Sequence, residues 1–432
     1  MTARLPRKSA AGTSVSLQNE RVTERPKARR VTRPRREQLL PARRRPAHLP
    51  MGEPEEMMTE RVRDFLARNP DLEPPFLVLD LDEVKKRYLA LAAEMPFADI
   101  YYAVKANPAR PILSLLAGLG SCFDCASPRE VRDVLDLGVV PSRISYGNTI
   151  KKDADIRTVW DLGIDLFAFD CEEELEKLAR MTPGARVFCR IVVDNTGADW
   201  PLSRKFGCEP EQATDLMLMA RDRGLVPYGL SFHVGSQQTN PLSFNSAIAS
   251  ATGVMGALRA KGVHLQMLNL GGGLPAHYDR SVPALANYGA VIKAALAESD
   301  LNGGLKQIIV EPGRYMVADA GTTVSEVVLT AQRGDQRWIY LDIGKFGGLA
   351  ETIDEAIRYR FVTKYNGDAT VPSVVAGPTC DSCDVLYEKN VCQLPAALKA
   401  GDRVHILSTG AYTTVYAAAN FNGIPPLQEF YI

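Results

Sequence analysis

The sequence alternates short β-rich runs with longer amphipathic stretches eight times, and this alternation limits the fold more than any other feature. The candidate strands are residues 99–104, 121–124, 143–146, 165–169, 186–193, 227–234, 265–270 and 306–311. Helical patterns lie between them, among others at 128–137, 171–180, 211–223, 244–261 and 284–298. An open doubly wound sheet shares this alternation, but eight units favour closure into a (β/α)8 barrel of the TIM type.

After about residue 315 the pattern changes to strand-like runs with few long helices between them. These runs are 322–330, 337–342, 371–376 and 403–407. We therefore expect an α/β barrel domain over residues 81–315 and a mainly β domain over residues 316–432. The segment 51–80 contains the apolar run Phe76-Leu77-Val78-Leu79, which suits a strand of either domain, and we assign it to the β domain.

The first 50 residues differ from the rest of the chain in charge. They hold 14 Lys and Arg against 3 Glu, although the whole chain has a net charge of zero. Scattered prolines and the lack of any helical or strand period predict a disordered tail over residues 1–50. Such a tail could bind nucleic acid or an anionic surface, act as an organellar presequence, or be a plain solvated extension.

Cysteine usage and hydropathy indicate a cytoplasmic protein. The eight cysteines are scattered, which is typical of a reducing compartment, and no long apolar run or secretory signal is evident. Two pairs have C-x-x-C spacing, Cys122 with Cys125 and Cys380 with Cys383. Zinc needs four ligands and about 250 residues separate the pairs, so we expect no metal site.

The residues that carry chemistry lie at or just after the ends of the predicted strands, where barrel enzymes place their sites. In chain order they are Lys105, His233, the triplet Gly271-Gly272-Gly273 and the run Glu311-Pro312-Gly313-Arg314. All of them would face one mouth of the barrel.

Each feature has a chemical interpretation and a plainer one. A lysine that ends an apolar strand is desolvated, which lowers its pKa and makes the amine nucleophilic, although most lysines are surface residues. The glycine triplet lets backbone N–H groups approach a phosphate that Arg314 can also bind, although it could be a simple loop. A lysine, a phosphate cradle and an acid for a pyridine nitrogen together predict a pyridoxal phosphate site.

At these motifs the chain, from about residue 75 to its end, resembles the fold-type III pyridoxal-phosphate decarboxylases. This family includes ornithine, lysine, diaminopimelate and arginine decarboxylases, and its barrel is shared with alanine racemase. The resemblance implies that Lys105 is the Schiff-base lysine, His233 stacks on the cofactor ring and Glu311 contacts the pyridine nitrogen. It implies further cofactor contacts from Asp124, Arg190, Ser236, Gly271, Gly272, Gly273, Gly313, Arg314 and Tyr412.

The same resemblance assigns catalytic and substrate groups to the second domain. Cys380, in Gly377-Pro378-Thr379-Cys380-Asp381, looks like the cysteine that protonates Cα after carbon dioxide leaves. The family is homodimeric, and its cysteine loop comes from the other subunit. Lys205 and Asp384 resemble a pair that bridges the two subunits.

The substrate implied by the resemblance is a basic amino acid, ornithine or lysine, with bacterial lysine/ornithine decarboxylases most similar. Candidate substrate-binding residues are Asp381, Asp354, Glu355 and Phe421, and the choice between Asp354 and Glu355 stays open. One methylene distinguishes the two substrates, which a pocket discriminates by only about 1–3 kcal/mol. The alternatives are a diaminopimelate or arginine decarboxylase, an amino-acid racemase, an inactive regulatory homologue, and a nucleic-acid binder acting through the tail alone.

Overall fold

A computed structural model describes residues 58–202, 205–299 and 305–432. The predicted tail, residues 1–50, and the first part of the 51–80 segment lie outside these described residues.

Eight parallel strands close into a barrel, as the alternating pattern predicts. In chain order they are β2 (Asp99–Ala103), β3 (Cys122–Cys125), β4 (Ile144–Tyr146), β5 (Leu166–Phe169), β6 (Arg186–Arg190), β8 (Val226–Ser231), β10 (Met267–Asn269) and β11 (Gln307–Val310). Each strand pairs with the next strand around the barrel, and the last strand, β11, pairs with the first, β2, to close it. The fold prediction of a (β/α)8 barrel is therefore confirmed.

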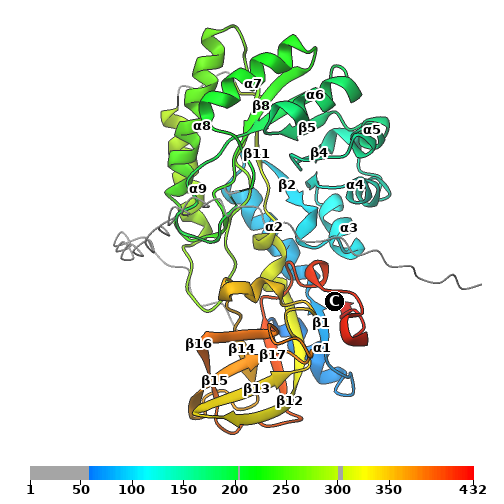
Figure 1. Ribbon diagram of the computed structural model, residues 1–432, viewed down its shortest axis with the longest axis vertical. Coiled ribbons are helices and arrows are strands. Elements are labelled where there is room, and N and C mark those ends of the chain that lie inside the picture. The colour runs from blue at the N-terminus through cyan, green and yellow to red at the C-terminus, as the bar shows by residue number, and fades with distance from the viewer. Residues whose placement is uncertain (1–57, 203–204, 300–304) are drawn as a thin grey trace, which may run out of the picture. The chain divides into compact units, whose positions relative to one another are not determined.

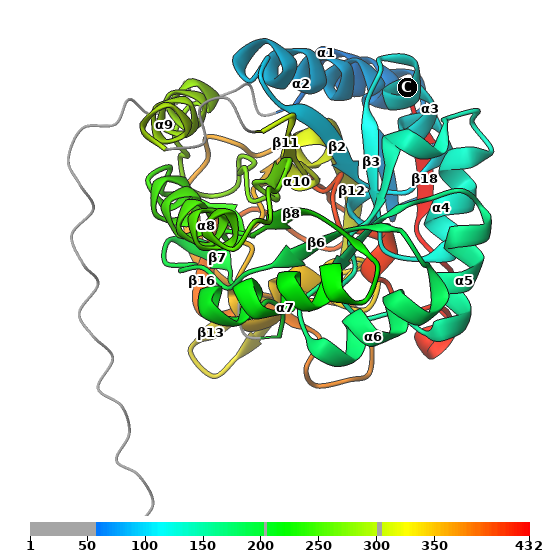
Figure 2. The same ribbon diagram turned by 90° about the horizontal axis from the view of Figure 1, so that it is seen from above.

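Helices surround the strands, as the view along the barrel in Figure 2 shows. They are α2 (Leu81–Glu94), α3 (Arg110–Gly118), α4 (Pro128–Leu135), α5 (Asp153–Asp161), α6 (Glu172–Met181), α7 (Pro210–Asp222), α8 (Ser243–Ala260) and α9 (Leu285–Glu298). None of the helices in the described residues combines the length and the apolarity needed to cross a bilayer. A two-stranded ribbon of β7 (Ala198–Trp200) and β9 (Ser236–Gln238) is inserted into this pattern.

The barrel interior is filled by side chains rather than open. Alternation along each strand sends one set of side chains inward and the other set toward the helices. The inward set forms its own apolar cluster, to which Tyr101, Leu166, Ala168, Phe188, Met267 and Ile309 contribute. Because this cluster fills the centre, a ligand can bind only at an end of the barrel.

The second domain is built on a mixed eight-stranded sheet, of which β1 and β12 to β17 are labelled in Figure 1. Its strands are β1 (Phe76–Leu79), β12 (Gly321–Arg333), β13 (Gln336–Leu341), β14 (Phe361–Thr363), β15 (Thr370–Ala376), β16 (Val385–Pro395), β17 (Arg403–Leu407) and β18 (Gln428–Tyr431). The strand β1 precedes the barrel in the sequence but pairs with β12 and with β18.

The edge strand β16 is the main element that the sequence pattern did not indicate. Its centre, Glu388-Lys389-Asn390, is exposed and breaks the apolar alternation. Charged residues in the middle of an edge strand protect it from pairing with other chains, and they remove the usual signal of a strand at the same time.

We predict that Phe188→Ala will destabilise the protein by about 3–5 kcal/mol, because it leaves a cavity in the barrel interior. Phe188 is 1% exposed. Urea unfolding should measure this loss. The control is Val226→Ala on the neighbouring strand β8, where a side chain that is 40% exposed should change stability by less than about 0.5 kcal/mol. Equal losses in the two variants would contradict a packed interior.

Candidate active site at the barrel mouth

Lys105 and Asp124 form the centre of the site. Lys105 lies in the single turn η1 (Val104–Ala106) that follows β2, and Asp124 lies on the adjacent strand β3. The Lys105 Nζ atom is 2.7 Å from Asp124 Oδ2. About half of the lysine side chain is exposed at the mouth, whereas Asp124 is buried. The pair presents an amine toward the open end of the barrel while its counter-charge is fixed inside.

The loops beside Asp124 keep it in place. Ser127 caps α4 by accepting a hydrogen bond from Glu130 N, and the Glu130 carboxylate accepts from Ala126 N. On the other side the chain passes so close that a Cβ atom at Gly147 would collide with the Asp124 carboxylate. The β3–α4 turn and a glycine in the next loop therefore determine where Asp124 can point.

The expectation of a lowered pKa for Lys105 is wrong for this arrangement. Desolvation does lower the pKa of the amine, but the nearby carboxylates of Asp124 and Glu311 outweigh it, so the pKa is raised above its usual value. The sequence pattern showed the apolar strand that leads to Lys105. It did not show that a buried acid from the neighbouring strand would reach the amine.

Glu311 follows β11 directly and is a second acid of the mouth. Its Oε1 atom accepts a 2.5 Å hydrogen bond from Asn269 Nδ2, at the end of β10. Burial, followed by repulsion from Asp124, raises the pKa of Glu311 to about 7. Asn269 is a site residue that the sequence analysis missed, because an asparagine at the end of a strand carries no signal of its own.

His233 lies two residues beyond β8. Burial lowers the pKa of His233 well below its ordinary value, and the positive charges of Arg190 and Lys105 lower it further. The ring is therefore neutral at pH 7. Its Nδ1 atom accepts a hydrogen bond from Gly235 N at 3.0 Å, so the proton lies on Nε2. Arg190, at the end of β6, has its guanidinium 5.2 Å from the centre of the Phe206 ring.

The glycine triplet follows β10 and passes very close to its neighbours. Gly271 and Gly273 have φ angles of +66° and +112°, which side chains rarely adopt. A Cβ atom at Gly272 would stand 2.6 Å from the Glu311 carbonyl oxygen and 3.2 Å from His233 Nε2. The triplet therefore packs against the chain that follows β8 and β11 more closely than any other residue type would permit.

Arg314 begins the short helix α10 (Arg314–Val317) and is 3% exposed. Its Nε atom donates to Ser236 Oγ, and its Nη1 atom donates to Tyr278 Oη. A bidentate ion pair joins it to Glu351, with distances of 2.6 and 2.5 Å. Glu351 is the second residue that sequence reasoning missed, because it lies in the β domain among other acids and no spacing connects it to Arg314.

The C-terminal segment reaches the same mouth. Tyr412 N donates to the Ala106 carbonyl, next to Lys105, and Asn107 Nδ2 donates to the Gly410 carbonyl. A Cβ atom at Gly313 would be 3.3 Å from the Tyr412 hydroxyl. The Tyr412 backbone adopts a φ of +57°, in the left-handed region that residues with side chains rarely occupy. The Tyr412 side chain thus lies beside both Lys105 and the Gly313–Arg314 turn.

Cys380 and Asp381 lie apart from this cluster, in an exposed loop of the β domain. Asn422 holds the loop: its Oδ1 accepts from Cys380 N at 3.0 Å, and its Nδ2 lies 3.2 Å from Cys380 Sγ. Asp381 Oδ1 accepts from Cys383 N, and both cysteines are free thiols. Within the single chain described, these contacts do not connect Cys380 or Asp381 to Lys105.

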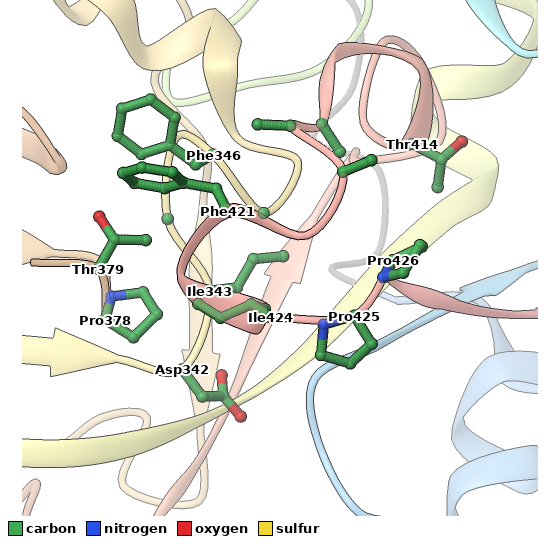
Figure 3. A pocket seen from close by; sticks show the side chains of 15 residues that line it. Asp342, Ile343, Phe346, Pro378, Thr379, Thr414, Phe421, Ile424, Pro425 and Pro426 are labelled. Carbon is green, nitrogen blue, oxygen red and sulfur yellow. The ribbon is translucent and has the colours of Figure 1, made fainter. Parts of the chain in front are cut away.

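A pocket of about 170 Å³ lies beneath this loop. Figure 3 shows Phe346 and Phe421 facing one another above Pro378 and Thr379, which precede Cys380. The two ring centres are 4.7 Å apart. Phe421, predicted to bind substrate, therefore lines the same pocket as the base of the cysteine loop.

The remaining candidates for substrate binding are Asp354 and Glu355, which lie in the β domain. Asp354 is exposed, and its ion pair with Lys389 spans 3.9 Å. The Glu355 carboxylate accepts from three backbone N–H groups of β16 and from Arg358. These bonds occupy both of its oxygens, which leaves Glu355 poorly placed to receive a substrate amine.

The predicted bridging residues, Lys205 and Asp384, are not in contact within the single chain. Asp384 is 2% exposed and accepts from Lys345 N, Thr379 N and Thr379 Oγ1. It thereby fixes the base of the cysteine loop. Lys205 is exposed, with its Nζ atom 4.8 Å from the centre of the Phe206 ring.

Three known proteins are similar to this chain. The lysine/ornithine decarboxylase of Selenomonas ruminantium is 37% identical over 349 residues, which cover 81% of this chain and 87% of that protein. The lysine/ornithine decarboxylase of Vibrio vulnificus, solved with putrescine, is 34% identical with a TM-score of 0.77, over 87% and 99% of the chains. The Paramecium bursaria Chlorella virus arginine decarboxylase, solved with agmatine, is 29% identical with a TM-score of 0.78, over 86% and 99%.

A barrel whose mouth combines a lysine, a glycine cradle and a buried arginine defines a pyridoxal-phosphate enzyme. Residues 81–318 match the profile described as "Pyridoxal-dependent decarboxylase, pyridoxal binding domain". The chain belongs to this family of pyridoxal-dependent decarboxylases.

The raised pKa of Glu311 predicts a pH-dependent stability of the cofactor-free protein. Between the ordinary pKa of 4.5 and about 7, the folded state keeps a proton that the unfolded state has lost, so stability falls as pH rises through this window. Glu311→Gln cannot titrate. Its stability relative to wild type, measured by urea unfolding, should therefore increase from pH 5 to pH 7.5. A stability difference between the two proteins that is constant with pH would refute the assignment.

Proposed function

We propose that this chain decarboxylates ornithine, lysine or both with pyridoxal phosphate, to yield putrescine or cadaverine. The observation that carries the proposal is the Lys105–Asp124 pair, which lies at one mouth with the glycine triplet and Arg314. The substrates named for the bacterial relatives support the same choice.

The mouth fits the cofactor in three respects. About half of the Lys105 side chain is exposed at the mouth, as attachment to an aldehyde requires. The loop of Gly271, Gly272 and Gly273 has no side chains that would block a phosphate, as a phosphate cradle requires. Ser236, Arg314 and Tyr412 lie beside the cradle and would complete the phosphate site. When bound, pyridoxal phosphate supplies the electron sink for the pair released from the breaking Cα–carboxylate bond.

The residues of the chain would act on charge and orientation. Glu311, with its pKa raised to about 7, would hold a proton beside the pyridine nitrogen. The neutral His233 ring would stack on one face, with Arg190 on the floor of the site. Asp124 would keep Lys105 protonated and oriented before attachment.

The exposed cysteine loop supports a homodimer with shared sites. Cys380 and Asp381 face solvent in the single chain, although the proposed chemistry needs a proton donor at Cα and an acid for the distal amine. A second subunit that supplied this loop would provide both. Lys205 is exposed and available to a partner, whereas Asp384 would need to accept one further hydrogen bond at the loop base. The free thiols support a reducing, cytoplasmic location.

We predict release of carbon dioxide from ornithine or lysine that depends on added pyridoxal phosphate. Arginine and diaminopimelate should react much more slowly. Lys105→Ala should abolish release, and Glu311→Gln should lower kcat by about 100-fold, because an amide keeps the ring nitrogen poorly protonated. The measurement is carbon dioxide evolution with each amino acid. If the cofactor binds but no substrate is decarboxylated, the protein is a racemase or a regulatory homologue.

A complementation experiment tests the shared site. Lys105→Ala and Cys380→Ala should each be nearly inactive alone, since each removes one half of every site. Mixed, unfolded and refolded together, they should recover about a quarter of wild-type activity, because random pairing makes half the dimers mixed, each with one intact site. Light scattering should give the dimer mass. No recovery in mixtures with dimeric mass would place Cys380 and Lys105 in the same subunit's site.

A further inference from the structure

Four of the five N–H groups of the Arg314 guanidinium already have partners before any ligand arrives. A guanidinium has five N–H donors. One donates to Ser236, one to Tyr278 and two to Glu351, with distances between 2.5 and 3.1 Å. One N–H remains for a phosphate. A phosphate at this position must therefore share the guanidinium with a carboxylate.

The Arg314–Glu351 ion pair is buried. Both side chains are 3% exposed, so the negative charge of Glu351 is screened little by water. The Tyr412 ring lies against the same guanidinium, 5.0 Å from Cζ to the ring centre. Removal of one partner from a buried pair leaves the other charge uncompensated, and this is strongly unfavourable.

Glu351 also connects two parts of the described chain. Arg314 follows the last barrel strand, whereas Glu351 lies in η4 (Ala350–Glu355), in the β domain. The Glu351 carbonyl accepts from Ile357 N, and Thr352 Oγ1 donates to the Leu349 carbonyl. The segment is thus held internally, and the ion pair is one of the contacts that join it to the barrel mouth.

We propose that Glu351 is a positioning residue that orients Arg314 and supplies its counter-charge until a phosphate monoester binds. The inference rests on the proposed function, in which Arg314 contacts the cofactor phosphate. A dianionic phosphate and the Glu351 carboxylate repel one another across one guanidinium. The carboxylate therefore stabilises the protein without cofactor and weakens phosphate binding, so the charge of Glu351 sets the affinity for the cofactor.

Two variants separate charge from geometry. Glu351→Gln keeps the shape and removes the charge, whereas Glu351→Asp keeps the charge and shortens the reach. Without cofactor, Glu351→Gln should have a lower Tm than wild type. Its Kd for pyridoxal phosphate should be about tenfold lower, because one buried like charge near the phosphate is gone. Glu351→Asp should also lose Tm but keep the wild-type Kd.

The matched control is Glu83→Gln. Glu83 pairs with a buried arginine, Arg87, at 2.8 Å, with side-chain exposures of 10% and 7%. This variant should lower Tm without changing the Kd for pyridoxal phosphate. Pyridoxal, which lacks the phosphate, should stabilise wild type and Glu351→Gln equally. Inorganic phosphate should raise the Tm of Glu351→Gln more than that of wild type.

The measurements are thermal unfolding with each of these three ligands and fluorescence titration with pyridoxal phosphate. An unchanged Kd in Glu351→Gln, or an equal effect of inorganic phosphate on wild type and Glu351→Gln, would overturn the inference. Failure of the proposed function gives a different result. Wild type would then show no stabilisation by pyridoxal phosphate and no bound-aldehyde absorbance that Lys105→Ala removes, while the inorganic phosphate comparison would still decide the role of Glu351.

Discussion

The pairing of β11 with β2 is the constraint on which the site depends. Ile309 and Val310 pair with Asp99 and Ile100, which makes the last barrel strand a neighbour of the first. The turns after these two strands carry Glu311 and Lys105. Residues more than 200 positions apart in the chain therefore share one mouth, and the attraction between their charges becomes possible only through closure.

The electrostatics of the mouth follow from crowding charges of both signs into a space with little water. Asp124 raises the pKa of Lys105 and of Glu311 together, although one is a base and the other an acid. Arg190 and Lys105 help to lower the pKa of His233. The outcome is a protonated lysine, a neutral histidine and an acid that titrates near pH 7. This pattern is suited to a ligand that carries an aldehyde, a ring nitrogen and a phosphate.

The β domain contributes side chains to the barrel mouth. Tyr412, held beside Ala106, and Glu351, paired with Arg314, reach into the barrel mouth from that domain. Their hydrogen bonds connect distant parts of the chain through buried polar groups, which must be satisfied for the fold to be stable. The cysteine loop differs, since Cys380 and Asp381 are exposed, and the side chains that hold the loop, Asn422 and Asp384, belong to the β domain itself.

Sequence patterns predicted the parts of the site that lie directly at strand ends. Lys105, Glu311 and the glycine triplet follow apolar runs, so the period of the barrel places them at one end. His233 was expected to end its strand but lies two residues beyond β8, because the chain there leaves the sheet to form the β7–β9 ribbon. Asn269 and Glu351 were missed, since neither has a distinctive neighbour in the sequence.

The sequence by itself determined the barrel, its order and the residue types at its mouth, because periodicity and strand-end position are local properties that burial enforces. The tertiary structure alone decided which charges meet. The pKa of Lys105 depends on Asp124 from the next strand, and the state of Arg314 depends on Glu351 from another domain. Coulomb energies depend on separation in space and on exclusion of water, and neither quantity is encoded in the spacing of residues along the chain.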